Sequence, residues 1–290
     1  GSIYPDWYVE TKNKWIKGKA LPTARNNMAS ARIGSKIYVI GGEYELSSDT
    51  IYSNKTECYD AITNTWETKA NFSMSLSQIS GCAIEDKIYV IGGYGESGYE
   101  TRHFCYDTKN DSWSSKTPAP GSSNNADVVA VNGLMYAICG HVYDTNNRAY
   151  DPSTNTWTTK TAIPVGRSDM ATTDLGDNIY VCGGYYSGVI NRIDCYSTTL
   201  NTWTLLSNEY YGYQSAATSL NGIIYLLAGM AGECKASYAF DPASKTLTQI
   251  ADISAGTVDP VAEAYNGHVY LIGGIMSTSN RNNNFCYIPE

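Results

Sequence analysis

Four glutamates in predicted loops are the residues of this chain whose type and placement best suit acid-base chemistry. They follow glycine-rich strand ends and are Glu43, Glu45, Glu96 and Glu233. Two such carboxylates that meet over a common opening could act as general acid and general base. A solvated position in a loop is the simpler explanation for each of them, and no serine stands in the sequence context of a nucleophile elbow. The sequence therefore gives catalysis little support.

Three histidines are the candidates for metal ligands, namely His103, His141 and His268. They are far apart in the sequence and stand in unlike contexts, whereas a metal site needs several His, Cys or carboxylate ligands that converge. The Gly-Gly pairs of the chain end predicted strands instead of opening helices, as a phosphate-binding loop would. We therefore expect no metal ion and no other cofactor.

The net charge indicates which classes of partner fit the protein, and the cysteines indicate which cellular compartment does. A net charge of −8 and a pI near 4.9 argue against nucleic acid and favour a neutral or cationic partner. No apolar run approaches the roughly 20 residues of a membrane span. Four of the eight cysteines recur in one sequence context, where they would lie too far apart to form disulfides. Free thiols favour the cytoplasm, with the cell surface or secretion as the alternative.

Tyrosine is the most informative residue type outside any regular pattern. The chain has 25 tyrosines, and ten of them fall in predicted loops. These are Tyr44, Tyr52, Tyr94, Tyr99, Tyr143, Tyr185, Tyr186, Tyr210, Tyr211 and Tyr213. Loop tyrosines provide rigid, amphipathic contact area at a low entropic cost, which suits a recognition surface. Packing of one loop against another is the alternative for any single one.

A repeated motif shows which elements must position these loops. An apolar run that ends in Gly-Gly or a related pair occurs six times, at 37–42, 88–93, 135–140, 179–184, 224–229 and 269–274. Most copies are followed by an aromatic residue and, seven positions later, by Trp: Tyr59/Trp66, Tyr106/Trp113, Tyr150/Trp157, Tyr196/Trp203 and the weakened pair Phe240/Leu247. Copies of a motif at such regular spacing mark structural repeats that must stack to bury their apolar faces.

Each repeat has the pattern of short strands and turns, without a sustained helical period. We therefore predict an all-β protein with six antiparallel four-stranded blades arranged as a propeller. The domain expected is a single propeller over 1–290, with blades near 22–68, 72–115, 120–159, 165–205, 211–250, and 255–290 plus 3–17. The last blade lacks its Trp strand, which Trp15 would supply and so close the ring. Its third strand could come from around Tyr8 or from around Tyr287.

The combination of Gly-Gly, Tyr, six residues and Trp resembles the kelch repeat, and the resemblance covers essentially the whole chain. The chain is similar to the six-bladed propellers of kelch-like adaptor proteins. It departs from the pattern where Cys139 and Ala228 replace the first glycine and where Leu247 replaces the Trp. We expect less regular packing in those blades.

The resemblance implies a ligand site at one opening of the ring, here called the mouth. In kelch adaptors the residue after each Gly-Gly contributes to this site, and here this first set is Glu43, Tyr94, His141, Tyr185, Met230 and Ile275. A polar position about eleven residues before each Gly-Gly strand also contributes, and this second set is Asn26, Ser77, Asn124, Ser168, Tyr213 and Val258. Arg25 and Arg167 precede two members of the second set, so an arginine-rich pocket for acidic peptides is mostly absent.

Two functions are compatible with this site. The first is a non-enzymatic module that binds a neutral, aromatic or basic protein segment. We expect such a propeller to be monomeric and to serve as the recruiting domain of a larger protein. The second is a sugar binder or carbohydrate-active enzyme, similar in architecture to six-bladed sialic acid mutarotases, that would use a loop glutamate with Arg25 or Arg167. A glutamate and an arginine facing each other across a closed pocket would favour the enzyme, and an open bowl lined by tyrosines would favour the module.

Overall fold

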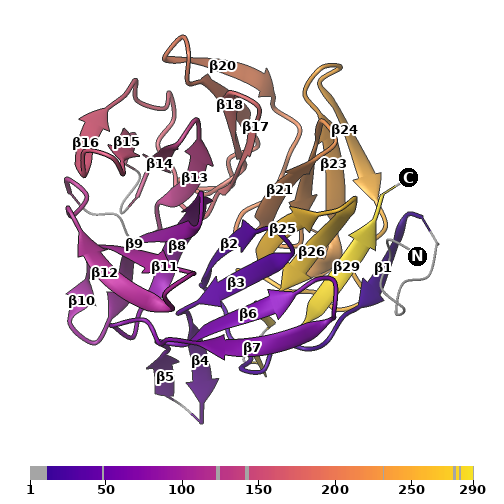
Figure 1. Cartoon of the computed structure of the whole chain (residues 1–290). Helices are drawn as coiled ribbons and strands as arrows, with labels where there is room; N and C mark the ends of the chain where they lie inside the picture. The colour runs from indigo at the N-terminus through magenta and orange to yellow at the C-terminus, as the bar shows by residue number, and fades with distance from the viewer. Residues whose placement is uncertain are drawn as a thin grey trace.

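A computed structural model describes residues 12–47, 49–121, 125–140, 144–230, 232–276, 279–280 and 282–289. The strands form six antiparallel sheets arranged around a central axis, which confirms the predicted six-bladed β-propeller (Figure 1). In each sheet the first strand lies at the centre of the ring, where it contacts the first strands of the neighbouring blades. The fourth strand lies at the rim.

The first three blades follow one another along the chain. Blade one contains β2 (Ala29–Ile33), β3 (Lys36–Ile40), β6 (Thr56–Asp60) and β7 (Thr65–Lys69). Blade two contains β8 (Ser77–Ile84), β9 (Lys87–Gly95), β11 (His103–Asp107) and β12 (Ser112–Lys116), with the short β10 (Gly98–Tyr99) paired to the end of β9. Blade three contains β13 (Asp127–Val131), β14 (Leu134–Ile138), β15 (Asn147–Asp151) and β16 (Thr156–Thr159).

The other three blades complete the ring. Blade four contains β17 (Ala171–Leu175), β18 (Asn178–Cys182), β19 (Ile193–Ser197) and β20 (Thr202–Ser207). Blade five contains β21 (Ala216–Leu220), β22 (Ile223–Leu227), β23 (Ser237–Asp241) and β24 (Thr246–Ile250). Blade six contains β25 (Val261–Tyr265), β26 (His268–Ile272), β29 (Asn284–Ile288) and β1 (Lys14–Lys17). Outside the blades lie two hairpins and one helical turn: β4 (Glu43–Leu46) with β5 (Asp49–Tyr52), β27 (Ile275–Met276) with β28 (Ser279–Asn280), and α1 (Gly232–Lys235).

The ring is closed by strands from the two ends of the chain, as the sequence predicted. β1 pairs with β29 in an antiparallel register that sets Trp15 opposite Tyr287. The third strand of blade six is therefore β29, which settles one of the two alternatives in favour of the segment around Tyr287. Tyr8, the other candidate, lies outside the described residues. Figure 1 shows β1 and β29 side by side near the two termini.

The hydrophobic core lies between the blades. The second strands are almost completely buried, and the core clusters combine side chains from neighbouring blades. One such cluster joins Val39 and Tyr59 of blade one to Tyr270 and Cys286 of blade six. All eight cysteines are free, and those in the third strands pack as small apolar side chains.

Each tryptophan of the repeat fastens its blade to the segment that leads into that blade. The Nε1 of Trp113 donates a hydrogen bond of 3.0 Å to the carbonyl oxygen of Ala70, and its ring lies 5.0 Å from that of Tyr106. Trp66, Trp157, Trp203 and Trp15 donate equivalent bonds to Lys19, Thr117, Thr161 and Ala251. Leu247, which stands at this position in blade five, has no side-chain N–H group to donate.

The Gly-Gly pairs are required by the close approach of neighbouring backbone. Gly42 has a φ of +91°, and a Cβ there would lie 2.5 Å from the carbonyl oxygen of Asn26. Cys139 and Ala228, which replace the first glycine in two blades, both keep a φ of +58° and are buried. The strand therefore ends in the same left-handed conformation in these blades, at some cost in backbone strain.

Replacing Trp113 by Leu, the residue that blade five has at this position, should destabilise the propeller by about 2 kcal/mol. The variant loses the hydrogen bond to Ala70 and part of a buried aromatic contact. Urea unfolding measures the change. A free energy of unfolding equal to that of the wild type would show that the tryptophan does not fasten the blade.

Candidate functional site

The two predicted sets of mouth residues are paired through their backbones. Bridges join Asn26 to Glu43, Ser168 to Tyr185 and Val258 to Ile275, and Ser77 lies opposite Tyr94 in the β8–β9 pairing. In blade five the backbone N–H of Met230 donates to the carbonyl oxygen of Tyr213 at 2.9 Å. Asn124 and His141, the pair of blade three, lie outside the described residues. The structure thus places the other members of the two sets side by side, blade by blade.

These residues differ in how far a ligand could reach them. Asn26 and Ser77 are buried, with 4% and 0% of their surface exposed. Met230 is 48% exposed, and the remaining described members are half-buried. The exposed surface at the mouth therefore comes mainly from the first set and from the tyrosines of the neighbouring loops.

Inside these pairs lies a ring of polar residues that sequence reasoning missed. It consists of the residue directly after each member of the second set, and we call it the throat ring: Asn27, Gln78, Asn125, Asp169, Gln214 and Asp259. All six have a φ between 51° and 54°. The signal was present as an Asn, Asp or Gln at one fixed position of every repeat, and Asn and Asp tolerate this left-handed conformation better than most residues.

The throat ring is joined from blade to blade by backbone hydrogen bonds. Gln214 donates its N–H to Asp169 at 2.8 Å, Asp259 to Gln214 at 2.9 Å and Asn27 to Asp259 at 3.4 Å. Asn125 donates to Gln78 at 3.4 Å. The six residues surround a cavity of about 100 Å³, which shares lining residues with a larger channel of about 390 Å³ between the first strands. The mouth therefore leads into the centre of the propeller.

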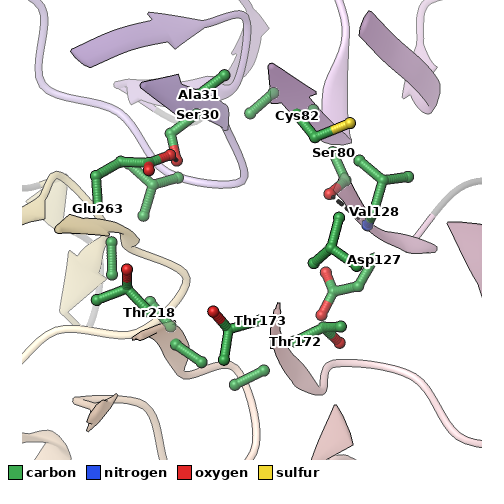
Figure 2. Close-up of a pocket in the computed structure, with 18 of the residues that line it drawn as sticks. Ser30, Ala31, Ser80, Cys82, Asp127, Val128, Thr172, Thr173, Thr218 and Glu263 are labelled. Atoms are coloured by element: carbon green, nitrogen blue, oxygen red, sulfur yellow. Dashed lines mark hydrogen bonds between the residues drawn. The ribbon is translucent and has the colours of Figure 1, made fainter. Parts of the chain in front are cut away.

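The channel is lined by small polar side chains and by carboxyl groups (Figure 2). Glu263 accepts a hydrogen bond of 2.8 Å from the hydroxyl of Ser30. The hydroxyl of Ser80 accepts one of 3.0 Å from the backbone N–H of Val128. Figure 2 shows Asp127 beside Thr172 in the lining of this channel.

Burial raises the pKa of several of these carboxyl groups. It brings the pKa of Asp127 to about 7 and that of Glu263 to about 7, although a hydrogen bond from Ser30 counteracts the shift at Glu263. The pKa of Asp259 is raised to about 8, first by burial and then by the negative charges of Asp169 and Glu43. Near neutral pH the centre of the ring therefore holds carboxyl groups that are partly protonated.

Stability should fall as the pH rises from 6.5 to 8.5. A carboxyl group with a pKa of about 7 or 8 in the folded state and about 4 in the unfolded chain binds protons more tightly when folded, so stability decreases as the pH rises from the unfolded pKa to the folded pKa and is constant above it. His103, whose pKa burial lowers to about 4, acts in the opposite direction only below about pH 6.5. Thermal unfolding at both pH values, for the wild type and for Asp259→Asn, measures this effect. The variant should show a smaller decrease, and an equal decrease in both proteins would contradict the shift at Asp259.

Tyrosines form two clusters at the mouth. In the first, the ring of Tyr94 lies 5.8 Å from that of Tyr52 and 5.0 Å from that of Tyr99, so this cluster joins blades one and two. In the second, Tyr185 of blade four and Tyr213, which precedes blade five, lie 5.4 Å apart. Because blades one and two stand opposite blades four and five in a six-membered ring, the two clusters face each other across the mouth.

Exposed apolar side chains concentrate in the loops at the same end of the ring. Nine large hydrophobic residues are exposed in the described part of the chain, and six belong to loops that follow a second strand or precede a first strand. These six are Leu46, Tyr99, Tyr186, Val189, Tyr211 and Met230. Such a concentration is typical of an interaction surface.

Arg25 and Arg167 lie inside the blades and not on the surface of the mouth. Both have no exposed surface. Arg25 forms an ion pair with Glu57 and donates to the carbonyl oxygen of Val39 at 3.1 Å. Arg167 makes the equivalent contacts in blade four, to Asp194 at 2.8 Å and to the carbonyl oxygen of Val181 at 3.1 Å. The ligand-binding role expected for these arginines does not fit this placement, which indicates a structural role.

Blade two shows how the same position can be filled without charge, because Leu76 and Phe104 stand where blade one has Arg25 and Glu57. Arg25→Leu alone should therefore destabilise the fold by about 3 to 5 kcal/mol, since it leaves a buried carboxylate unpaired. Adding Glu57→Phe should recover most of that loss. Chemical unfolding of the single and double variants measures the difference, and a double variant no more stable than Arg25→Leu would refute the equivalence.

Comparison with known proteins agrees with the repeat pattern. A family model described as the KLHDC2/KLHL20/DRC7 Kelch-repeats domain matches residues 7–184 and 78–274. The chain belongs to the kelch-repeat family. This kelch propeller is 25% identical over 246 residues to Kelch-like protein 36 of Rattus norvegicus, and this alignment covers 79% of the chain and 40% of that relative. It is 26% identical over 260 residues to Kelch-like protein 23 of Pongo abelii, and this alignment covers 84% of the chain and 44% of that relative. The kelch propeller thus spans less than half the length of these relatives.

Within the described ranges, no three His, Cys, Asp or Glu side chains are arranged so that they could hold a metal ion. In that same part of the chain, none of the helices has the length and apolar character that crossing a membrane requires.

Proposed function

We propose that this kelch propeller is a non-enzymatic binding module that recognises a protein or peptide segment at its mouth. The observation that carries the proposal is the concentration of exposed apolar side chains in the loops of that one end. Tyrosine rings held on a rigid scaffold offer contact area at a low entropic cost, and loops so positioned commonly carry function. The relatives that it matches are named as kelch-like proteins, which supports a role in protein interaction.

The chemistry of the mouth favours a neutral, aromatic or basic segment over an acidic one. The two arginines next to the second set are buried in ion pairs, so neither is available to bind carboxylates or phosphates of a ligand. The net charge of −8 would also oppose the approach of an acidic partner. We further propose that the module is monomeric and acts in the cytoplasm. Because the matched relatives extend well beyond it, we also propose that it recruits partners for a longer protein.

An enzyme of the mutarotase kind has less support. Glu43 accepts a hydrogen bond from Asn27 and Glu45 accepts one from Thr50, at 3.0 Å and 3.1 Å. Neither forms an ion pair with Arg25 or Arg167, because those guanidinium groups pair with Glu57 and Asp194 inside the blades. The arrangement of loop glutamate and arginine that would favour catalysis is therefore not formed by these residues.

Replacing Tyr94, Tyr185 and Tyr213 together by Ala should weaken peptide binding by about tenfold or more. Peptides would first be selected on the wild-type propeller from a random twelve-residue display library, and their dissociation constants measured by fluorescence anisotropy. The substitution removes ring contacts from both tyrosine clusters.

The matched control is Ile62→Ala with Leu200→Ala, which removes exposed apolar side chains from loops that join third to fourth strands. This control should bind the selected peptides as the wild type does. If the library gives no peptide whose affinity depends on the three tyrosines, while both variants unfold at the wild-type temperature, the proposal fails.

A further inference from the structure

Acidic side chains are unevenly distributed around the mouth. Asp169 and Asp259 of the throat ring flank Gln214, whose Nε2 donates to the carboxylate of Asp259 at 3.0 Å. Next in the ring is Asn27, which donates from Nδ2 to the carboxylate of Glu43 at 3.0 Å. We call the three carboxylates Asp169, Asp259 and Glu43 the acidic arc. The rest of the described throat ring, Gln78 and Asn125, is neutral.

The described residues supply no cation to this arc. None of the ion pairs in the described part of the chain includes Asp169, Asp259 or Glu43. Other arginines near this end of the blades are held by different carboxylates: Arg102 by Glu100 at 3.2 Å, and Arg148 by Asp144 at 3.6 Å. No ion pair of the described residues therefore neutralises these carboxyl groups. Burial raises the pKa of Asp259 and of Asp169, so their negative charge near neutral pH is reduced until an approaching cation favours the ionised forms.

The arc connects the two tyrosine clusters. At one end, Asp169 follows Ser168, whose backbone pairs with Tyr185 of the second cluster. At the other end, Glu43 pairs across the β4–β5 hairpin with Tyr52 of the first cluster. The arc therefore runs through blades four, five, six and one, from one tyrosine cluster to the other. A ligand that contacts both clusters must cross the opening beside these carboxylates.

We propose that the mouth binds a partner segment in which a Lys or Arg side chain lies over the acidic arc and an apolar or aromatic residue on each side packs on a tyrosine cluster. This inference rests on the proposed function and adds the order of residues that the site selects. Carboxylates and amide oxygens of the arc would stabilise the bound cation. They are only partly exposed, so solvent screens this attraction less than at an open surface. The flanking residues bury exposed tyrosine and apolar surface.

A basic side chain suits this geometry better than a metal ion. Metal binding needs several ligands that converge within about 2 to 3 Å of one point. Here amide residues separate the carboxylates, since Gln214 stands between Asp169 and Asp259 and Asn27 stands between Asp259 and Glu43. An ammonium or guanidinium group has several donors and can use such a spread of acceptors.

The test is a double-mutant cycle on peptides from the same random library. In each peptide that depends on the three mouth tyrosines, the basic residue expected between two apolar residues is replaced by Met. The affinity of both peptides is then measured for the wild type and for Asp259→Asn, with Asp169→Asn as a second variant. A neutral amide keeps the size of the carboxyl group, and thermal unfolding reports whether each variant is folded.

The proposal predicts that Lys or Arg occurs between two apolar residues in the selected peptides. Its replacement should weaken binding to the wild type by about tenfold or more, and should matter much less for Asp259→Asn or Asp169→Asn. Peptides that depend on the tyrosines but carry no basic residue, or whose basic residue contributes equally to wild type and both variants, would overturn this inference and leave the proposed function standing. If no selected peptide depends on the tyrosines, the proposed function falls and this inference falls with it.

Discussion

The structure depends on the fact that no blade can bury its own faces. Each four-stranded sheet has apolar side chains on both sides, and the second strand is buried almost throughout because neighbouring blades cover it. Core clusters therefore belong to pairs of blades, as where Tyr59 of blade one packs with Tyr270 of blade six at 6.0 Å. Only a closed ring covers every face, and the pairing of β1 with β29 completes that ring.

This dependence explains which parts of the molecule the sequence revealed. The Gly-Gly pairs, the tyrosine-tryptophan spacing and the incomplete ends are local patterns repeated six times, and each repetition strengthens the prediction of the ring. Blade order and closure followed from them, and the structure confirmed both. Only the third strand of blade six remained open, because Tyr8 and Tyr287 offered equivalent local patterns and the choice depends on long-range pairing.

The site was less accessible to sequence reasoning. Position in the repeat located the residues that pair at the mouth, but not the direction of their side chains. Arg25 and Arg167 illustrate this limit, because their partners Glu57 and Asp194 are 32 and 27 residues away along the chain. The throat ring was missed for a related reason. Its residues vary among Asn, Asp and Gln at one position of the repeat, and the φ near 53° that makes them a ring is a property of the backbone.

Closure between distant segments also affects how the protein is made. Tyr287 donates a hydrogen bond of 2.9 Å to Asn13, a residue 274 positions earlier. During synthesis, β1 must therefore wait unpaired until β29 has left the ribosome, while the outer face of the growing stack of blades remains uncovered. Contacts of such sequence separation slow folding and prolong the exposure of strand edges. The strand pairing that completes the finished ring is thus also the one that leaves the nascent chain dependent on protection from aggregation.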